Sequence, residues 1–349
     1  MTSGVIERYA GRLPVTAATP RVSLAEGATP CVESVAIGSD LGLRSLHFKL
    51  EGANPTGSFK DRGMAVAVAK ALEAGSRAIA CASTGNTSAS AAAYGARCGI
   101  RVGVAVPAAG VAAGKLTQAQ IHGAVVMSVR GNFDSALRAV RELCDAWPVT
   151  LVNSLNPHRI AGQKTAAFEV VDELGDAPDV VALPVGNAGN ITAYWRGFRE
   201  YFQEGLCTRL PRMIGGQAAG AAPLVHGHPV ADPQTVASAI RIGNPASWQQ
   251  AIEARDQSEG LIDSVTDQEI LEAQQRLAAM EGIFCEPASA AALAVLAKSV
   301  RSGAIAPGSR VVCILTGNGL KDIATVMSSL ATPVPVDADG ESLARALGV

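Results

Sequence analysis

The amino-acid sequence predicts an α/β fold with mostly parallel sheets and flanking helices, divided into two domains. Short apolar runs repeatedly end in loops rich in Gly, Asn, Ser and Thr, and helical stretches follow those loops. The chain has 349 residues, of which 48% are hydrophobic, which is long for one core and suits two compact domains. Because parallel α/β sheets bind ligands at the carboxyl ends of their strands, the loops after the apolar runs are the candidate sites. The clearest apolar runs are 77–82, 101–106, 179–185 and 310–315, and the helical stretches are 88–98, 191–202 and 322–330.

Composition excludes several classes of function. The net charge is −2 and only 17% of residues are charged, so we expect no nucleic-acid partner and no anionic membrane surface. No apolar run approaches the ~20 residues that span a bilayer, and the Ala-rich stretch 288–297 predicts a buried helix. Residues 1–12 lack the plan of a signal peptide. Seven scattered cysteines without a Cys-x-x-Cys pair predict reduced thiols, no metal site and a cytoplasmic protein.

The segment 54–64 contains the strongest candidate for a catalytic residue, Lys60. Asn-Pro-Thr-Gly predicts a turn, and Ser58 is a candidate N-cap for a helix that continues through Val68. The positive end of a helix disfavours a lysine in the first turn, and burial beside Phe59 would lower the pKa of that amine further. Such an amine can form an imine with a carbonyl cofactor. An ordinary solvated lysine is the alternative interpretation of this segment.

Two further loops have the composition of anion sites. Ser83, Thr84, Gly85, Asn86 and Thr87 bring hydroxyls, an amide and backbone N–H groups to a helix start, which suits a carboxylate or a phosphate. A hydroxyl-rich helix cap is the alternative. The second loop consists of Gly186, Asn187, Ala188, Gly189 and Asn190. Its glycines would let the backbone approach a phosphate, although the loop matches neither the P-loop nor the dinucleotide fingerprint. A connecting loop that binds no ligand is equally compatible with this sequence.

Polar side chains also follow two more apolar runs. Thr316 would leave a pyridine nitrogen unprotonated if its hydroxyl faced that nitrogen, and the alternative is a glycine turn with a satisfied threonine. Asn153, Ser154 and Arg159 follow another run, and an arginine fork matches the oxygens of a phosphate. The alternative there is a loop with a surface arginine.

Together these windows resemble a known family. Segment 54–64 resembles the Schiff-base lysine segment of fold-type II pyridoxal-phosphate enzymes, which have a two-domain fold like the tryptophan synthase β chain. The five windows in this order resemble the threonine synthase family over nearly the whole chain. Gly-Asn-Ala-Gly-Asn and Thr316 favour this family over threonine dehydratases and cysteine synthases. About 28 residues precede Thr29-Pro30, so we expect the short class without the S-adenosylmethionine-binding extension. Further matches are 29–30, 49–51, 162–165, 239–248 and 286–289.

The resemblance implies a reaction and a domain plan. The family converts O-phospho-L-homoserine and water into L-threonine and phosphate with pyridoxal 5′-phosphate, by γ-elimination and β-addition of water. The large cofactor-binding domain would comprise residues 1–52 and 152–330, the small mobile domain 53–151, and a tail 331–349. A homodimer is expected.

It also implies a role for each site residue. Lys60 would hold the cofactor covalently and act as general base, Asn86 would bind the 3′ oxygen of the cofactor, and Thr316 would face its ring nitrogen. Gly186, Asn187, Ala188, Gly189 and Asn190 would bind the cofactor phosphate. The substrate carboxylate would lie on Ser83, Thr84, Asn86 and Thr87, and the substrate phosphate on Thr87, Asn153, Ser154, Arg159, Asn187 and Lys60.

Two other functions stay open at this point. A serine or threonine dehydratase of the same fold would need no phosphate site for its substrate. A non-catalytic binding protein on this fold would be expected to lack the lysine or the loop 186–190, and both are present. A dinucleotide-dependent oxidoreductase lacks its fingerprint.

Overall fold

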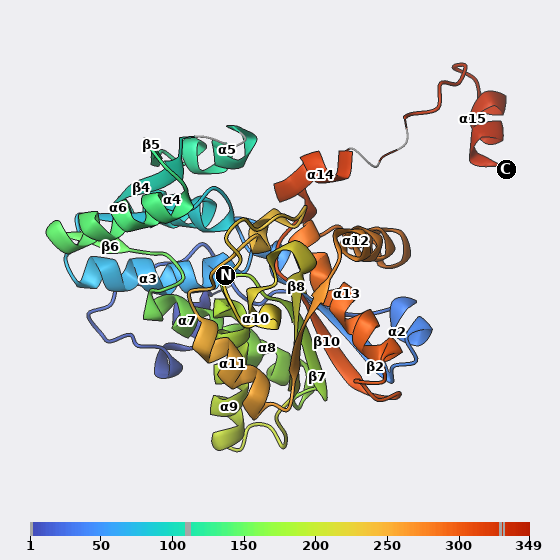
Figure 1. Ribbon diagram of the computed structural model, residues 1–349, viewed down its shortest axis with the longest axis horizontal. Helices are drawn as coiled ribbons and strands as arrows, with labels where there is room; N and C mark the ends of the chain where they lie inside the picture. The colour runs from blue at the N-terminus through green and yellow to red at the C-terminus, as the bar shows by residue number, and fades with distance from the viewer. Residues whose placement is uncertain (1–2, 109–112, 328–329, 331) are drawn as a thin grey trace.

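The computed structural model describes residues 3–108, 113–327, 330 and 332–349, and two β-sheets form its framework (Figure 1). Within this part of the chain the larger sheet has the strand order β1-β2-β10-β7-β8-β9, in which β1 alone runs antiparallel to its neighbour. The smaller sheet has the order β5-β4-β3-β6, and its described pairs are parallel. This confirms the predicted α/β class with mostly parallel sheets. The strands are β1 Cys31–Glu33, β2 Ser45–Leu50, β3 Ala78–Ala82, β4 Arg101–Pro107, β5 Val125–Val129, β6 Val149–Leu151, β7 Val180–Pro184, β8 Arg212–Ala218, β9 Leu261–Val265 and β10 Arg310–Leu315.

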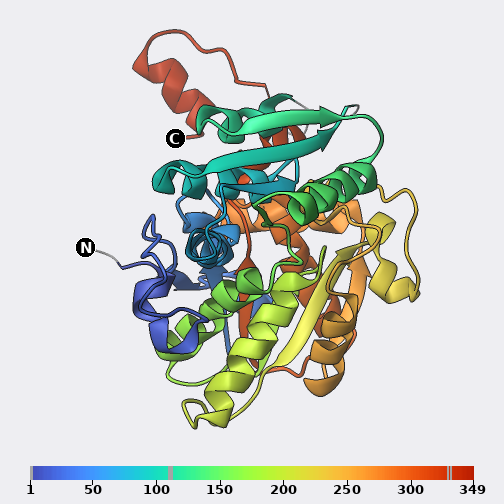
Figure 2. The same cartoon turned by 90° about the vertical axis from the view of Figure 1, so that its left-hand side faces the viewer.

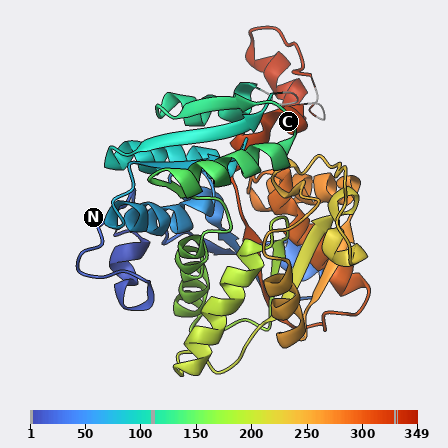
Figure 3. The same ribbon diagram turned by 60° about the vertical axis from the view of Figure 1, so that its left-hand side comes forward.

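Helices cover both sheets (Figures 2 and 3). The long helix α13 lies against β7, β8, β9 and β10 with α12 behind it, while α9 and α11 contact β8 and α8 packs on α9. In the smaller sheet, α4 and α6 contact β3 and β4. Helix α3 begins at Lys60 and packs on α7 and α4. It therefore lies between α4, which covers the smaller sheet, and α7, which packs on α9. The longer helices are α3 Lys60–Glu73, α4 Asn86–Cys98, α5 Ala113–Ile121, α6 Phe133–Ala146, α7 Pro157–Gln163, α8 Thr165–Leu174, α9 Gly189–Gln203, α11 Trp248–Gln257, α12 Asp267–Glu281 and α13 Pro287–Arg301.

Short elements complete the chain. They are α1 Val5–Arg8, α2 Ile37–Asp40, α10 Pro223–His226, α14 Ile323–Met327, α15 Gly340–Leu347, and the 3-10 turns η1 Ala10–Arg12, η2 Glu51–Ala53, η3 Ala219–Ala221, η4 Ser238–Ile240 and η5 Gly319–Asp322. Helix α15 projects away from the body of the molecule in Figure 1, and its residues are exposed or half-buried. Among the described residues, no helix is both long and apolar enough to cross a membrane.

The core depends on close approach of helices to the sheets. The Ala-rich stretch 288–297 is buried within α13, as predicted. Gly216 in β8 makes room for it, because a Cβ on that glycine would lie 2.6 Å from the carbonyl oxygen of Ala291. The seven cysteines are free thiols, and the four buried ones pack as small hydrophobes in the apolar core.

Candidate active site

Backbone hydrogen bonds join the loop before α3 to the loop after β10. The Phe59 N–H donates to the Thr316 carbonyl at 3.0 Å, and the Asn318 N–H donates to the Gly57 carbonyl at 2.9 Å. Ser58 forms an isolated bridge with Gly317 between them. The prediction that Ser58 caps the helix is therefore wrong, because α3 begins at Lys60 and the Ser58 backbone pairs with the other loop. Its buried hydroxyl has no hydrogen-bond partner within the residues that the structure describes.

Lys60 lies in the first turn of α3, as the sequence predicts, and the residue is half-buried. Its Nζ lies 4.3 Å from the centre of the Phe59 ring. Burial, and then the positive charge of Arg159, lower the pKa of Lys60 from 10.5 to about 7, while Glu286 opposes that change. A substantial fraction of this amine is therefore neutral at neutral pH, which is the form that attacks a carbonyl or accepts a proton.

Arg159, in α7, is fully buried rather than on the surface. Its Nη1 donates to the Val152 carbonyl at 2.7 Å, but Nε and Nη2 have no partner among the described residues. Burial lowers the pKa of this guanidinium to about 10. Gly63 lets α3 approach, since a Cβ there would lie 2.5 Å from the Arg159 carbonyl oxygen and 3.0 Å from its Nε. Two charged donors inside the protein that no described group satisfies are suited to an anion.

The loop after β3 meets two other segments. Asn86 begins α4 and its Nδ2 donates to both carboxylate oxygens of Glu286, at 3.1 Å each. The amide of Asn153, after β6, exchanges hydrogen bonds with the backbone N–H and carbonyl of Ala82, both at 2.9 Å. Asn153 thus fixes the end of β3, next to the polar loop. Ser83, Thr84 and Thr87 in that loop are half-buried, as is Ser154.

The loop after β7 reaches α9 through a left-handed residue, Ala188, with φ +64°. Asn187 is tied to the 246–247 backbone, because its Oδ1 accepts from the Ala246 N–H at 3.2 Å and its carbonyl accepts from the Ser247 N–H at 3.2 Å. Asn190 is buried, and in the described part of the chain neither end of its amide has a partner. A Cβ on Gly189 would lie 3.2 Å from Ile160 Cδ1, so this loop lies beside the Arg159 segment. A tight loop, a helix N-terminus and an unsatisfied buried amide together suit a phosphate.

Thr316, directly after β10, is buried, and its hydroxyl lies 2.8 Å from the Ser289 hydroxyl. Ser289 Oγ also accepts from the Gly317 N–H at 2.8 Å. These contacts fix the threonine hydroxyl where the loop passes the Lys60 segment. The contacts described so far link all five sequence windows into one site.

Comparison with known proteins agrees with this geometry. A family profile described as "Pyridoxal-phosphate dependent enzyme" matches residues 22–317. The chain is 58% identical to the threonine synthase of Halalkalibacterium halodurans over 94% of this chain and 92% of that one. It is 55% identical to the threonine synthase of Mycobacterium tuberculosis strain H37Rv over 99% of this chain and 96% of that one. The chain belongs to the threonine synthase family of pyridoxal-phosphate enzymes. Among solved structures, maize serine racemase covers 94% of this chain with a TM-score of 0.77 at 20% identity, which shows the shared fold-type II architecture.

The residues of this threonine synthase family member fit its cofactor. An aldehyde needs a neutral amine, and the lowered pKa of Lys60 supplies one. A phosphate needs donors, which the start of α9 and the unpartnered Asn190 amide offer. A pyridine ring needs a hydrogen-bonding group for its nitrogen, and the Thr316 hydroxyl is positioned by Ser289.

Two features of the site were not assigned from the sequence. Glu286 and Ser289 stood in the matching run 286–289 without a role; a carboxylate before a proline at a helix start was the only signal.

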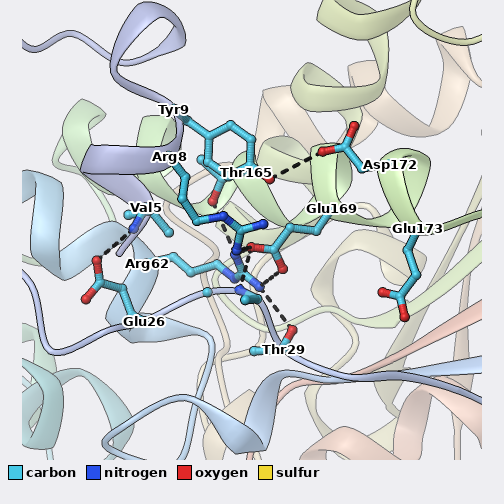
Figure 4. A network of polar contacts seen from close by, with 12 residues as sticks. Val5, Arg8, Tyr9, Glu26, Thr29, Arg62, Thr165, Glu169, Asp172 and Glu173 are labelled. Carbon is cyan, nitrogen blue, oxygen red and sulfur yellow. Dashed lines mark hydrogen bonds and ion pairs between the residues drawn. The ribbon is translucent and has the colours of Figure 1, made fainter. Parts of the chain in front are cut away.

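The second feature is the buried ionic cluster around Arg62, two residues after Lys60 (Figure 4). Arg62 forms hydrogen bonds of 2.7 Å to each oxygen of Glu51, and of 2.7 and 2.6 Å to those of Glu169. Lys49 adds an ion pair of 2.9 Å with Glu169, so this cluster fixes the first turns of α3.

Proposed function

We propose that this protein converts O-phospho-L-homoserine and water into L-threonine and phosphate, the threonine synthase reaction. The observation that carries the proposal is Arg159, a buried cation whose charge acts on Lys60 and whose Nε and Nη2 have no partner among the described residues. A substrate with a terminal phosphate would satisfy those donors, whereas the substrates of a serine or threonine dehydratase would leave them unpaired.

The proposed cofactor contacts come from four segments. Lys60 would hold pyridoxal 5′-phosphate covalently, and the backbone of Gly186, Asn187, Ala188, Gly189 and Asn190 would bind its phosphate. Asn86 would donate to its 3′ oxygen, and Thr316 would face its ring nitrogen. When bound, the cofactor supplies the electron sink that stabilises negative charge on the substrate carbons.

The proposed substrate contacts divide between carboxylate and phosphate. Ser83, Thr84, Asn86 and Thr87 lie around a helix N-terminus, where backbone N–H groups favour the α-carboxylate. Arg159 would bind the phosphate with support from Thr87, Ser154 and Asn187. Asn153 would contribute indirectly. Its amide is already hydrogen-bonded to the Ala82 backbone, so it orders the loop that carries Ser83.

Proton transfer is proposed for Lys60. Freed when the substrate amine replaces it, its Nζ would take the proton from the substrate α-carbon. It would then take a proton from the β-carbon, and the electron pair of that C–H bond would expel the γ-phosphate before water adds at the β-carbon. A base with a pKa near 7 suits this exchange, because it can both accept and donate at neutral pH. Closure of the small domain, residues 53–151, over the large domain, 1–52 and 152–330, would exclude bulk water.

The proposal is tested by supplying phosphohomoserine to the purified, cofactor-loaded protein. Release of inorganic phosphate with equimolar threonine supports it. Release of 2-ketobutyrate from threonine, without phosphate release from phosphohomoserine, would favour a dehydratase, and no turnover of either would favour a binding protein.

We also propose a cytoplasmic homodimer. The seven free cysteines support a reducing compartment. The outward-facing apolar residues of the tail, Leu343 at 52% and Leu347 at 77% exposed, support association with a second copy. Sedimentation of the full chain measures the oligomeric state directly.

A further inference from the structure

Glu286 is a buried carboxylate to which the mechanism above gives no task. It immediately precedes α13 and is 4% exposed. Glu286 is the N-cap residue of α13, but within the part of the chain that the structure describes its side chain makes no capping hydrogen bond. Its two carboxylate oxygens instead accept from Asn86 Nδ2, across 200 residues of sequence.

The surrounding backbone is arranged to place this carboxylate. The Glu286 N–H donates to the Gly317 carbonyl at 3.0 Å, and Cys285 pairs with Asn318 in an isolated bridge. A Cβ on Gly317 would lie 2.5 Å from the carboxyl group, so the glycine leaves the space that the carboxylate fills. Glu286 therefore touches the loop of Asn86 and the loop of Thr316, and its charge acts on Lys60.

Stability alone does not account for a carboxylate here. Burial raises the pKa of Glu286, against the Asn86 hydrogen bond and the charges of Lys321 and Lys60, while Asp322 adds to the rise. A buried carboxylate bonded to a neutral amide costs free energy that a well-packed apolar side chain would not. Local choices that cost stability are expected where a site requires them.

We infer that Glu286 is a positioning residue, whose carboxylate fixes the orientation of the Asn86 amide and places a negative charge beside Lys60. A carboxylate only accepts hydrogen bonds, so it selects the NH₂ end of the amide. If one N–H of the Asn86 amide is shared between the two Glu286 oxygens, it accounts for both distances of 3.1 Å. The second N–H of that amide is then available to the 3′ oxygen of the cofactor. The charge counters that of Arg159, so Lys60 can hold a proton during turnover. This inference rests on the roles proposed above for Lys60 and Asn86.

The orientation effect is tested by a double-mutant cycle on cofactor affinity. Cofactor-free Asn86→Ala, Glu286→Ala and the double variant are titrated with pyridoxal 5′-phosphate and followed by absorbance. We expect each single variant to lose about tenfold in affinity, the loss of one hydrogen bond, and the double variant to bind like Asn86→Ala. Multiplication of the two losses would overturn the inference and leave the proposed function standing. An unchanged affinity in Asn86→Ala would remove Asn86 from the cofactor site and would also overturn the inference, whereas the proposed reaction stands or falls with phosphate and threonine release.

The charge effect is tested without cofactor. Competitive acylation at a series of pH values, read by mass spectrometry, measures the pKa of Lys60 in the cofactor-free protein. Glu286→Gln keeps the shape and one acceptor but loses the charge, so the pKa of Lys60 should fall by about one unit. Glu281→Gln is the matched control, because Glu281 bonds to Ser34 and the 35–37 backbone away from the site, and it should leave that pKa unchanged. An unchanged pKa in Glu286→Gln would contradict the inference. If Glu286→Gln does not fold, Glu286→Asp keeps the charge and should preserve the pKa of Lys60 while losing the coupling to Asn86.

Discussion

Replacement of Arg159 by methionine separates activity from stability. The side chain is fully buried and makes one described hydrogen bond, to Val152, while Nε and Nη2 are unpartnered. Burial lowers the pKa of the guanidinium from 12.5 to about 10, which corresponds to roughly 3 kcal/mol against the charged form in the folded protein. Arg159→Met removes that cost and fills most of the volume, but it leaves the Val152 carbonyl without its partner, at a cost of about 1–3 kcal/mol.

The two effects nearly cancel in the free protein. We expect the free energy of unfolding of cofactor-free Arg159→Met to be unchanged or higher by up to about 2 kcal/mol. The phosphate of the substrate, by contrast, loses a buried charged partner worth about 2–5 kcal/mol, so kcat/KM should fall by about 30-fold to several thousandfold. Cofactor absorbance should be retained, since Arg159 is proposed to bind only the substrate.

Phosphate release gives kcat/KM, and denaturant unfolding gives the stability. Arg196→Met is the matched control, because Arg196 lies exposed on α9, and it should leave kcat/KM within about twofold. An unchanged kcat/KM in Arg159→Met would remove this residue from the substrate site. A loss of several kcal/mol in stability would refute the reasoning that the guanidinium is held there at a cost.

Two more predictions concern the charged groups around α3. Lys60 has a folded-state pKa of about 7 against 10.5 for a free lysine, so between these pH values the unfolded chain binds more protons and stability rises with pH. In cofactor-free protein, Lys60→Met should abolish that part of the rise, and identical pH–stability curves for the two proteins would show that the amine is not perturbed. Arg62→Met leaves the buried Glu51 and Glu169 without their main partner, so the free energy of unfolding should fall by roughly 3–5 kcal/mol in chemical denaturation. Glu173→Gln, at the exposed edge of the cluster, is the control and should lower it by less than about 1 kcal/mol. A loss as small as that of the control would contradict the conclusion that the ion pairs of Arg62 hold the two buried carboxylates.

The sequence predicted the framework and most of the candidate site. The apolar run 310–315 coincides with β10, and 179–185 and 77–82 exceed β7 and β3 by one or two residues, because alternation of apolar runs with glycine loops is a local signal. Lys60 stood out for the same reason, since its place in the first turn of a helix can be read from its neighbours. The loops of these strands meet because the carboxyl ends of parallel strands share one edge.

Long-range contacts account for what local patterns missed. Ser58 resembles a helix cap, but its backbone pairs with Gly317, more than 250 residues away. Nothing near Glu286 in the sequence indicates that its side chain turns from its own helix toward Asn86. Arg159 could equally have been a surface arginine in its loop, and only the packing of α3 on α7 shows that it is buried.

The most direct test of this account is the chemical identity of the residue that carries the cofactor. The freshly purified protein, supplied with pyridoxal 5′-phosphate and treated with borohydride, is digested and mapped by mass spectrometry. We predict a pyridoxyl group on the peptide containing Lys60, and its absence in Lys60→Met. A colourless protein without an adduct, or an adduct on another lysine, would contradict the account.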